Sequence, residues 1–266
     1  MYPLLEGKKA LIMGVANKRS IAWGIAQSFA KANAEIILTY QTERLRENVE
    51  QLAASLQTPA TVIGPCDVQS DAELDEVFEK VGAHFGGKLD TLVHCLAFAN
   101  REDLMGSFTN TSRAGYALAQ DISSFSLIAT AKRARPLLEA AGGGSIISLT
   151  YLGAERVVKN YNVMGVAKAA LEASVRYCAQ DLGTLNIRVN AISAGPIKTL
   201  AASGVRDFGK VLNYVKDITP LKRNTEQAEV GDTAVFLASE MARGITGEVI
   251  HVDSGYHLLG LMVADE

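Results

Sequence analysis

The sequence predicts an α/β fold, a doubly wound Rossmann-type sheet of about seven parallel strands with helices on both faces. Two observations lead to this prediction. Short apolar segments alternate with amphipathic segments along the whole chain, which is the pattern of right-handed βαβ crossovers. The apolar segments are also too continuous for strands buried on one face only, so both faces of the sheet should be covered.

The first half of the chain is expected to contain four strands and the helices that connect them. Its first apolar run stops at Gly14, as a buried strand would, and apolar residues at helical spacing follow it. In order, the elements are a strand at Lys9–Met13, a helix at Ile21–Asn33, a strand at Glu35–Thr39, a helix at Glu43–Leu56, a strand at Thr61–Pro65, a helix at Ala72–Phe85 and a strand at Thr91–Cys95.

The second half continues the alternation. The elements are a helical stretch at Ile122–Ala141, a strand at Ser145–Thr150, a helix from about Tyr161 to Leu182, a strand at Arg188–Ile192, helices at Asp207–Ile218 and Glu226–Ala238, and a strand at Glu248–Val252. Glycines at 142–144 and a loop at Gly195–Gly204 separate these elements. No change of composition marks a boundary, so residues 1–266 are predicted to form one domain.

Composition narrows the possible functions. The 266 residues are 48% apolar and carry a net charge of −3, which suits a globular protein with a sizeable core and predicts no nucleic-acid partner. Cys66, Cys95 and Cys178 lie far apart without metal-ligand spacing, so we expect reduced thiols, no metal site and a cytoplasmic location. The apolar runs are too short to span a membrane, and no signal region precedes the first strand.

The loop after the first strand is a candidate dinucleotide site. It runs from Gly14 through Ser20 to Gly24 and lacks the G-x-G-x-x-G fingerprint. A small residue at Gly14 lets the backbone approach a pyrophosphate, and the following helix, with Ser20 as its cap, offers free N–H groups. An ordinary strand–helix turn is the alternative interpretation.

Residues after the second and third strands bear on the type of cofactor. Gln41 is neutral and can bond a ribose 2′-hydroxyl, whereas the nearest cation, Arg44, falls inside the next helix, so NADH is favoured over NADPH. Asp67 and Val68 are expected beside the adenine. A helix-capping turn at Asp67 is equally compatible with the sequence.

Tyr161 and Lys168 form the candidate catalytic pair. They are seven residues apart, which on a helix is two turns, or roughly 10 Å of rise, on one face. A phenol and an ammonium group so placed can straddle a nicotinamide ribose. The alternative is a core tyrosine with a surface lysine.

With these residues the chain resembles the short-chain dehydrogenase/reductase superfamily, and within it the enoyl-acyl carrier protein reductases of bacterial type II fatty-acid synthesis. No tyrosine here has a lysine four residues later, as ordinary superfamily members do. The spacing of Tyr161 and Lys168 and the second tyrosine, Tyr151, are those of the enoyl reductases. The motifs that carry the resemblance are the loop at 14–22, Tyr151–Arg156, Ala191–Ile197, Thr199–Gly204 and His251–Asp253.

The resemblance implies that the chain uses NADH to reduce the 2,3 double bond of trans-2-enoyl thioesters on acyl carrier protein. Tyr161 would bond the enolate oxygen, Lys168 would hold the nicotinamide ribose, and Tyr151 would stand beside the acyl chain. The implied cofactor contacts are Gly14, Ser20, Ile21, Gln41, Asp67, Val68, Cys95, Lys168, Ile197 and Thr199. The implied substrate pocket is Ala97, Tyr151, Tyr161, Met164, Ala201 and Phe208.

The resemblance further implies a homotetramer with two-fold axes and a covering segment at 199–218. The helix from Tyr161 to Leu182 and the segment Val249–Leu261 should lie between subunits. One departure is Ala97, which adds a methyl group where the family usually has glycine. Ser148 stands where ordinary members carry a catalytic serine, and we expect a structural role for it.

Two other functions remain to be distinguished. A reductase acting on a carbonyl is disfavoured because the four-residue spacing of tyrosine and lysine is absent. A catalytically silent nucleotide-binding or scaffold protein is disfavoured because both Tyr161 and Lys168 are present.

Overall fold

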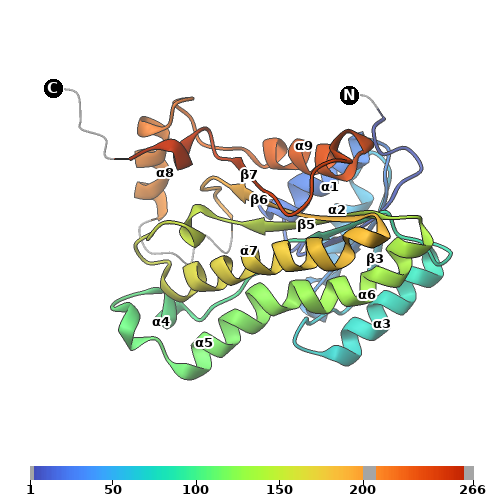
Figure 1. The fold of residues 1–266 in the computed structure, drawn as a ribbon, viewed down its shortest axis with the longest axis horizontal. Coiled ribbons are helices and arrows are strands. Elements are labelled where there is room, and N and C mark those ends of the chain that lie inside the picture. The colour runs from blue at the N-terminus through green and yellow to red at the C-terminus, as the bar shows by residue number, and fades with distance from the viewer. Residues whose placement is uncertain (1–2, 200–207, 261–266) are drawn as a thin grey trace.

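Seven parallel strands form one sheet in the computed structural model, which describes residues 3–199 and 208–260 (Figure 1). The order across the sheet is β3-β2-β1-β4-β5-β6-β7. The strands are β1 Lys9–Met13, β2 Glu35–Thr39, β3 Thr61–Ile63, β4 Thr91–His94, β5 Gly144–Thr150, β6 Ile187–Ala194 and β7 Val249–Val252. The predicted fold class and the predicted strands are confirmed, with ends that differ by at most two residues.

Helices cover both faces of this sheet. They are α1 Ile21–Lys31, α2 Glu43–Ala54, α3 Asp71–His84, α4 Arg101–Leu104, α5 Arg113–Gln120, α6 Ser126–Ala140, α7 Asn162–Leu182, α8 Phe208–Ile218 and α9 Gln227–Ala238. Short 3₁₀ turns occur at η1 Phe108–Asn110, η3 Leu152–Ala154, η4 Gly183–Leu185, η6 Glu240–Ala242 and η7 Tyr256–Leu258, and a π-helical turn, η2, at Asp121–Phe125.

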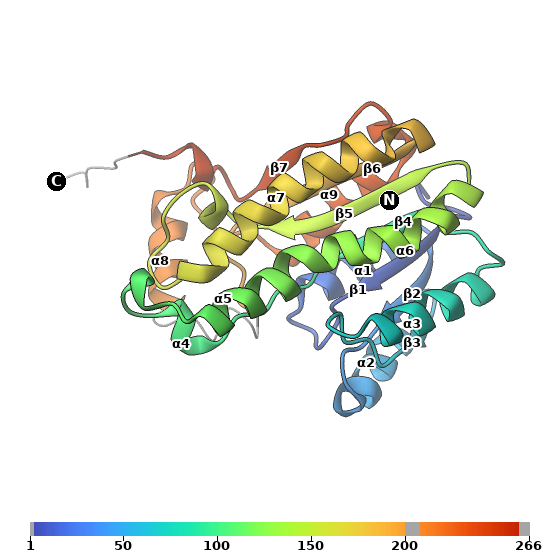
Figure 2. The ribbon, with the colours of Figure 1, turned by 60° about the horizontal axis from the view of Figure 1, so that its bottom comes forward.

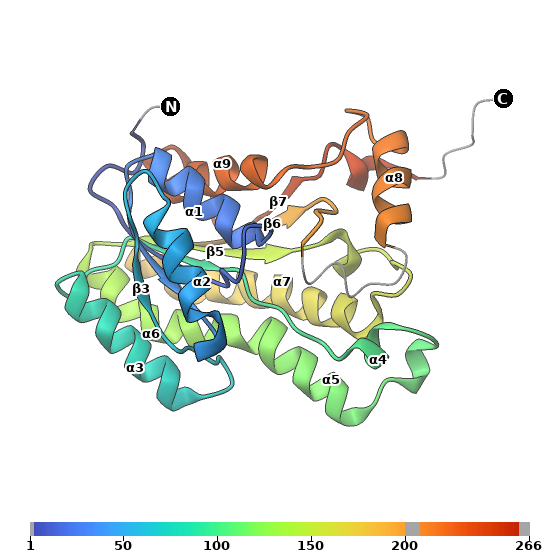
Figure 3. The ribbon, with the colours of Figure 1, turned by 180° about the vertical axis from the view of Figure 1, so that it is seen from behind.

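Two apolar cores lie on opposite sides of the sheet. One contains buried residues of α1, α2 and α9, and the other contains buried residues of α3, α6 and α7. Figure 3 shows α1 and α9 side by side on one face, with α3, α6 and α7 on the other. Burial of the strands from both sides explains why their apolar runs are continuous rather than alternating.

The region between β4 and α6 differs from the prediction. The expected helical stretch at Ile122–Ala141 begins earlier, since α5 runs through the π-helical turn into α6 (Figure 2). The first part, α5, buries only Gly115 and Ala119, so it has almost no apolar stripe to reveal a helix in the sequence. Together with α4 and α8, α5 lies beyond the carboxyl ends of the strands (Figures 1 and 2).

Membrane insertion through a helix is not supported over residues 3–199 and 208–260. None of the helices there combines the length and the apolar character that a transmembrane span needs.

Candidate active site

The strand order reverses between β1 and β4, and the segments after these two strands meet at this point. Gly14 has a φ of 100°, and a Cβ atom there would overlap the carbonyl oxygen of Cys95. Only glycine combines this backbone conformation with so close an approach. Gly14 therefore lets the loops after β1 and β4 meet, at the place where doubly wound sheets bind dinucleotides.

The N-terminus of α1 opens onto the same crevice. The backbone N–H groups of Ile21 and Ala22 have no partner among the residues that the structure describes. Ser20 is the N-cap residue, but its hydroxyl accepts from the N–H groups of Ala16 and Asn17, both at 3.1 Å, and not from α1. The prediction that the Ser20 side chain caps α1 is therefore wrong. The hydroxyl closes the preceding loop instead, which leaves the helix N-terminus available to a phosphate.

A further residue, Asn48 on α2, holds this loop in place. Its Nδ2 atom donates to the carbonyl oxygen of Ala16 at 2.5 Å. Sequence analysis missed Asn48, because a polar residue on an exposed helix face carries no signal of its own.

Gln41 is the second residue after the end of β2. Gln41 and Arg44 are both exposed. The next cation along α2, Arg46, is occupied by Glu43 at 3.8 Å and by Glu50 at 2.8 Å. The geometry thus places a neutral amide, rather than a free cation, directly after the strand.

Asp67 follows β3 and takes part in a turn. Its Oδ1 atom accepts from the N–H of Gln69 at 3.0 Å, and Ser70 then caps α3 by accepting from Glu73. Asp67 is thus part of a turn before α3, but Ser70 and not Asp67 caps the helix. Its second carboxylate oxygen has no partner within the described residues, and Val68 packs at the margin of the core. A contact with an adenine therefore stays a prediction.

Tyr161 sits at the start of α7 against Tyr151. It is the N-cap residue, one position before the helix, rather than part of the helix as predicted. The two phenol rings meet edge to face, with centroids 5.1 Å apart and planes at 73°. A Cβ atom at Gly153 would overlap the Tyr161 ring, so Gly153 makes the room in which this ring lies.

Lys168 is buried, with 5% of its surface exposed, which excludes the alternative of a surface lysine. Its Nζ atom donates to the carbonyl oxygen of Leu149 at 2.6 Å. Burial lowers the pKa of Lys168 to about 8, while Cys95 and Glu172 act in the opposite direction. An ammonium group has three donors, and one is used here, so two remain for a ligand such as a pair of ribose hydroxyls.

The pKa values of Tyr161 and Tyr151 are shifted in the same direction. Burial raises the pKa of Tyr161, and Tyr151 adds to this effect. Burial likewise raises the pKa of Tyr151, with smaller contributions from Tyr256 and Asp253. Tyr161 is therefore a neutral phenol at physiological pH, and its hydroxyl has no hydrogen-bond partner within the described residues. It is a donor available to an oxygen that gains negative charge.

Ser148 lies on β5, one residue before Leu149, whose carbonyl oxygen accepts from Lys168. It is fully buried, and its hydroxyl lies 3.0 Å from Nδ1 of His94. Nε2 of His94 lies 2.7 Å from the hydroxyl of Ser126. Burial lowers the pKa of His94 to about 3, so the ring is neutral. The expected structural role of Ser148 fits this buried network, which sequence analysis did not identify.

The remaining predicted residues are distributed around the same edge. Ala97 is exposed on the loop after β4, and Met164 is buried in a cluster with Tyr161. Ile197 packs at the margin of the core near α1, and the N–H of Thr199 bonds the carbonyl of Ile197. Ala201 lies outside the described residues, and the side chain of Phe208 does too.

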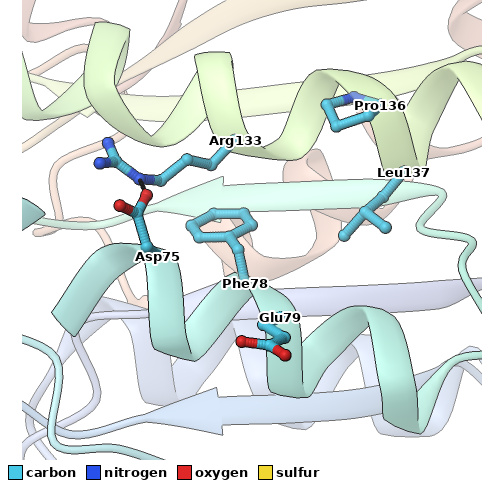
Figure 4. Close-up of a pocket in the computed structure, with 6 residues that line it drawn as sticks. All are labelled: Asp75, Phe78, Glu79, Arg133, Pro136 and Leu137. Atoms are coloured by element: carbon cyan, nitrogen blue, oxygen red, sulfur yellow. Dashed lines mark hydrogen bonds and ion pairs between the residues drawn. The ribbon is translucent and has the colours of Figure 1, made fainter. Parts of the chain in front are cut away.

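A surface hollow of about 310 Å³ lies between α3 and α6 and does not include the candidate site residues (Figure 4). Arg133 holds it together by bonding Asp75 at 2.6 Å and Asp71 at 2.8 Å. None of the residues that line it belongs to the predicted site. The lining residues are Asp75, Phe78, Glu79, Arg133, Pro136 and Leu137.

Comparison with known proteins identifies relatives along almost the whole chain. A family model described as enoyl-(acyl carrier protein) reductase matches residues 14–257. The NADH-dependent enoyl-acyl carrier protein reductase FabI of Bacillus cereus is 58% identical over 257 residues, covering 97% of this chain and 99% of that protein. The NADPH-dependent FabI of Staphylococcus aureus is 52% identical over 255 residues, covering 96% and 98%.

Solved structures agree with these matches. The crystal structure of the Bacillus cereus reductase with NADP+ and indole naphthyridinone has a TM-score of 0.94, covering 98% of this chain and 100% of that one. The Anaplasma phagocytophilum reductase in complex with NAD has a TM-score of 0.93 at 47% identity, covering 99% of each chain.

Proposed function

The chain belongs to the enoyl-(acyl carrier protein) reductase family, and on that premise we propose that Tyr161 and Lys168 carry its reaction, with Tyr151 beside the acyl chain. It is an oxidoreductase that reduces the 2,3 double bond of trans-2-enoyl-acyl carrier protein in the last step of each fatty-acid elongation cycle. The observation that supports the residue assignment best is the buried ammonium group of Lys168, which keeps two donors free at the carboxyl edge of the sheet.

The cofactor is NADH, as in most of the named relatives. When bound, it supplies a hydride to the β-carbon of the enoyl thioester and leaves as NAD+. The residues present fit such a group. The free N–H groups of Ile21 and Ala22 suit the pyrophosphate, the donors of Lys168 suit the ribose beside the nicotinamide, and Gln41 suits an unphosphorylated adenosine ribose.

Tyr161 stabilises the negative charge that develops on the thioester oxygen. Its phenol is neutral and partly buried, so it donates a hydrogen bond to the enolate oxygen at a site of reduced polarity. Lys168 keeps a positive charge at the same edge and orients the ribose. The α-carbon then takes up a proton that comes ultimately from solvent, and the product is the saturated thioester.

The test of this function is oxidation of NADH by the purified chain with crotonyl or dodecenoyl thioester, beside an acetoacetyl thioester. We expect turnover of both enoyl substrates and none of the ketone. Turnover of the acetoacetyl thioester alone would identify a carbonyl reductase. Binding of NADH without turnover of any thioester would identify a silent nucleotide-binding protein.

The substrate reaches the site on acyl carrier protein, the carrier that the family name specifies. We assign the segment at 199–218 to a cover that closes over the acyl chain, within a single catalytic domain. The amphipathic sequence of α8 supports this assignment, and residues 200–207 lie outside the described part of the chain. The free cysteines Cys66, Cys95 and Cys178 support a cytoplasmic location.

We assign a homotetramer to the active protein. The supporting observation is exposed apolar surface on the two elements expected between subunits. Tyr177 on α7 is 79% exposed and Leu258 after β7 is 70% exposed, while β7 is a half-buried strand at the edge of the sheet. Light scattering should give the mass of four chains, and a monomer at micromolar concentration would contradict the assignment.

A further inference from the structure

The loop after β4, residues 95–100, connects the cofactor edge of the site to the acyl pocket. At its start, the carbonyl of Cys95 lies against Gly14. At its far end, Ala99 packs against the buried cluster of Met164 and its neighbours, to which Tyr161 also belongs. Between these points Ala97 is exposed and Phe98 is 50% exposed, so the middle of the loop faces outward at the mouth of the site.

One buried side chain fixes the middle of this loop. The hydroxyl of Ser123 accepts from the N–H of Phe98 at 2.9 Å and donates to the carbonyl oxygen of Phe98 at 3.0 Å. These are the only hydrogen bonds to the backbone of residues 96–99 from any residue that the structure describes. Ser123 itself is fully buried. The position of the Phe98 backbone therefore depends on a single hydroxyl group.

The π-helical turn η2 brings Ser123 to this place. Its wider winding interrupts the long helix made of α5 and α6 at the point where the helix passes the loop (Figure 2). Such turns occur often at functional sites. Ser126, three residues on, lies on the same helix face and contacts His94, so one helix holds the strand end at 94 and the loop at 98 together.

The hydrogen bonds of Ser126 show how the helix holds His94 at the end of β4. Its hydroxyl donates to the carbonyl oxygen of Ile122 at 2.6 Å, so it must accept from Nε2 of His94. His94 then uses Nδ1 to accept from Ser148. These bonds hold the end of β4, and Ser123 makes the described hydrogen bonds to the backbone of the loop that follows.

We propose that Ser123 is a positioning residue that sets the wall of the acyl pocket by holding the backbone at Phe98. The proposal rests on the proposed function, since it gives the loop its role in binding the acyl chain. Ser123 touches neither cofactor nor reacting atoms. It acts through residues 97–99, and its loss should affect binding of long acyl chains before it affects hydride transfer.

The test compares Ser123→Ala with Ser124→Ala in the full-length protein. Ser124 is the matched control because it is the next residue of the same turn, is 6% exposed and makes no side-chain hydrogen bond within the described residues. Ser123→Thr keeps the hydroxyl and serves as the rescue variant. For each protein we would measure kcat and KM with crotonyl and dodecenoyl thioesters, the Kd of NADH, and the thermal midpoint.

We expect Ser123→Ala to raise KM for the dodecenoyl thioester about tenfold, the size expected for losing one to two hydrogen bonds. The KM for crotonyl thioester, kcat and the Kd of NADH should change by less than about threefold, because the shorter chain meets less of the wall. Ser124→Ala should match the wild type, and Ser123→Thr should recover most of the affinity. If Ser123→Thr does not fold, the comparison of the two alanine variants decides.

Two results would overturn the inference while leaving the proposed function intact. One is equal kinetics for Ser123→Ala and Ser124→Ala. The other is a rise in KM of Ser123→Ala that is equal for crotonyl and dodecenoyl thioesters and accompanied by a lower thermal midpoint. That result would make Ser123 a purely structural residue. A wild-type chain that reduces no enoyl thioester would overturn the proposed function itself, and the inference with it.

Discussion

Replacing Lys168 by methionine should weaken cofactor binding strongly without destabilising the fold. Burial lowers the pKa of Lys168 from 10.5 to about 8. At about 1.4 kcal/mol for each factor of ten in proton affinity, keeping this ammonium group charged near neutral pH costs the folded state about 3 kcal/mol. Methionine fills a similar volume without a charge, so this cost disappears in the variant.

The lost hydrogen bond offsets part of that gain. Nζ of Lys168 donates to the carbonyl of Leu149, and removing the bond costs about 1 kcal/mol, or up to about 3 if the carbonyl is left unpaired. The free energy of unfolding should therefore stay unchanged or rise by up to about 2 kcal/mol. For a chain of this size, each kcal/mol corresponds to about 2–4 °C in Tm. The Kd of NADH should rise about 100-fold, because charge-assisted bonds to the ribose are lost.

The assay is chemical denaturation at fixed protein concentration, combined with fluorescence titration by NADH. Lys132→Met, on the exposed face of α6, is the control and should change neither quantity. The pH dependence of the free energy of unfolding gives a second test. Between pH 8 and 10.5 the unfolded wild type binds more protons than the folded one, so the free energy of unfolding contributed by Lys168 rises with pH there, and the methionine variant lacks this rise. If the free energy of unfolding of Lys168→Met is lower than that of the wild type by more than about 2 kcal/mol, the reasoning is refuted and Lys168 is a stabilising core residue.

Three further predictions concern the same site. Tyr161→Phe should lower kcat about 100-fold and change the Kd of NADH by less than about threefold, because the hydroxyl matters once charge develops on the thioester oxygen. Stopped-flow turnover measures the first effect and equilibrium titration the second. Full activity of the variant would exclude the assigned role. The affinity for NADH should fall as the pH rises through about 8, where Lys168 loses its charge, and an equally steep pH profile in Lys168→Met would assign the effect to another group. Gln41→Arg should improve kcat/KM for NADPH relative to NADH about tenfold, while a wild-type preference for NADPH would show that Arg44 already reaches the 2′-phosphate.

The strands and most helices could be predicted because burial on both faces of the sheet imposes continuous apolar runs of limited length. β1 and β2 match the prediction residue for residue, since each ends where a glycine or a polar loop begins. The region from α4 to the π-helical turn could not be predicted in the same way. It covers the carboxyl edge of the sheet and not its face, so it carries no long apolar stripe.

In the candidate site, too, some residues could be predicted from the sequence and others could not. Motif spacing predicted Tyr161, Lys168 and the loop at Gly14 as site residues, because chemistry at that edge demands particular residue types. Asn48 acts through one hydrogen bond and Ser123 through two, in each case to the backbone of a residue distant in sequence, and such partners have no local signature. Ser20 shows the converse: a serine before a helix is a strong cap signal, yet its hydroxyl turns back to Ala16.

The seven-residue spacing of Tyr161 and Lys168 has a physical consequence for the reaction. When the lysine is four positions after the tyrosine, as in ordinary superfamily members, the tyrosine lies one turn from the lysine on the same helix face. Here α7 begins at Asn162, so Tyr161 precedes the helix and projects from its end, while Lys168 lies in its interior. Burial is the main cause of the raised pKa of Tyr161, and Tyr151 adds to it. The phenol is therefore suited to donate a hydrogen bond to an enolate, whereas a tyrosine whose pKa is lowered by an adjacent ammonium group is suited to transfer a proton to a carbonyl oxygen.

Moving the lysine to the four-residue position, by Gly165→Lys together with Lys168→Met, should not create a carbonyl reductase, because position 165 lies against the carbonyl of Gly153 and leaves no room for a side chain.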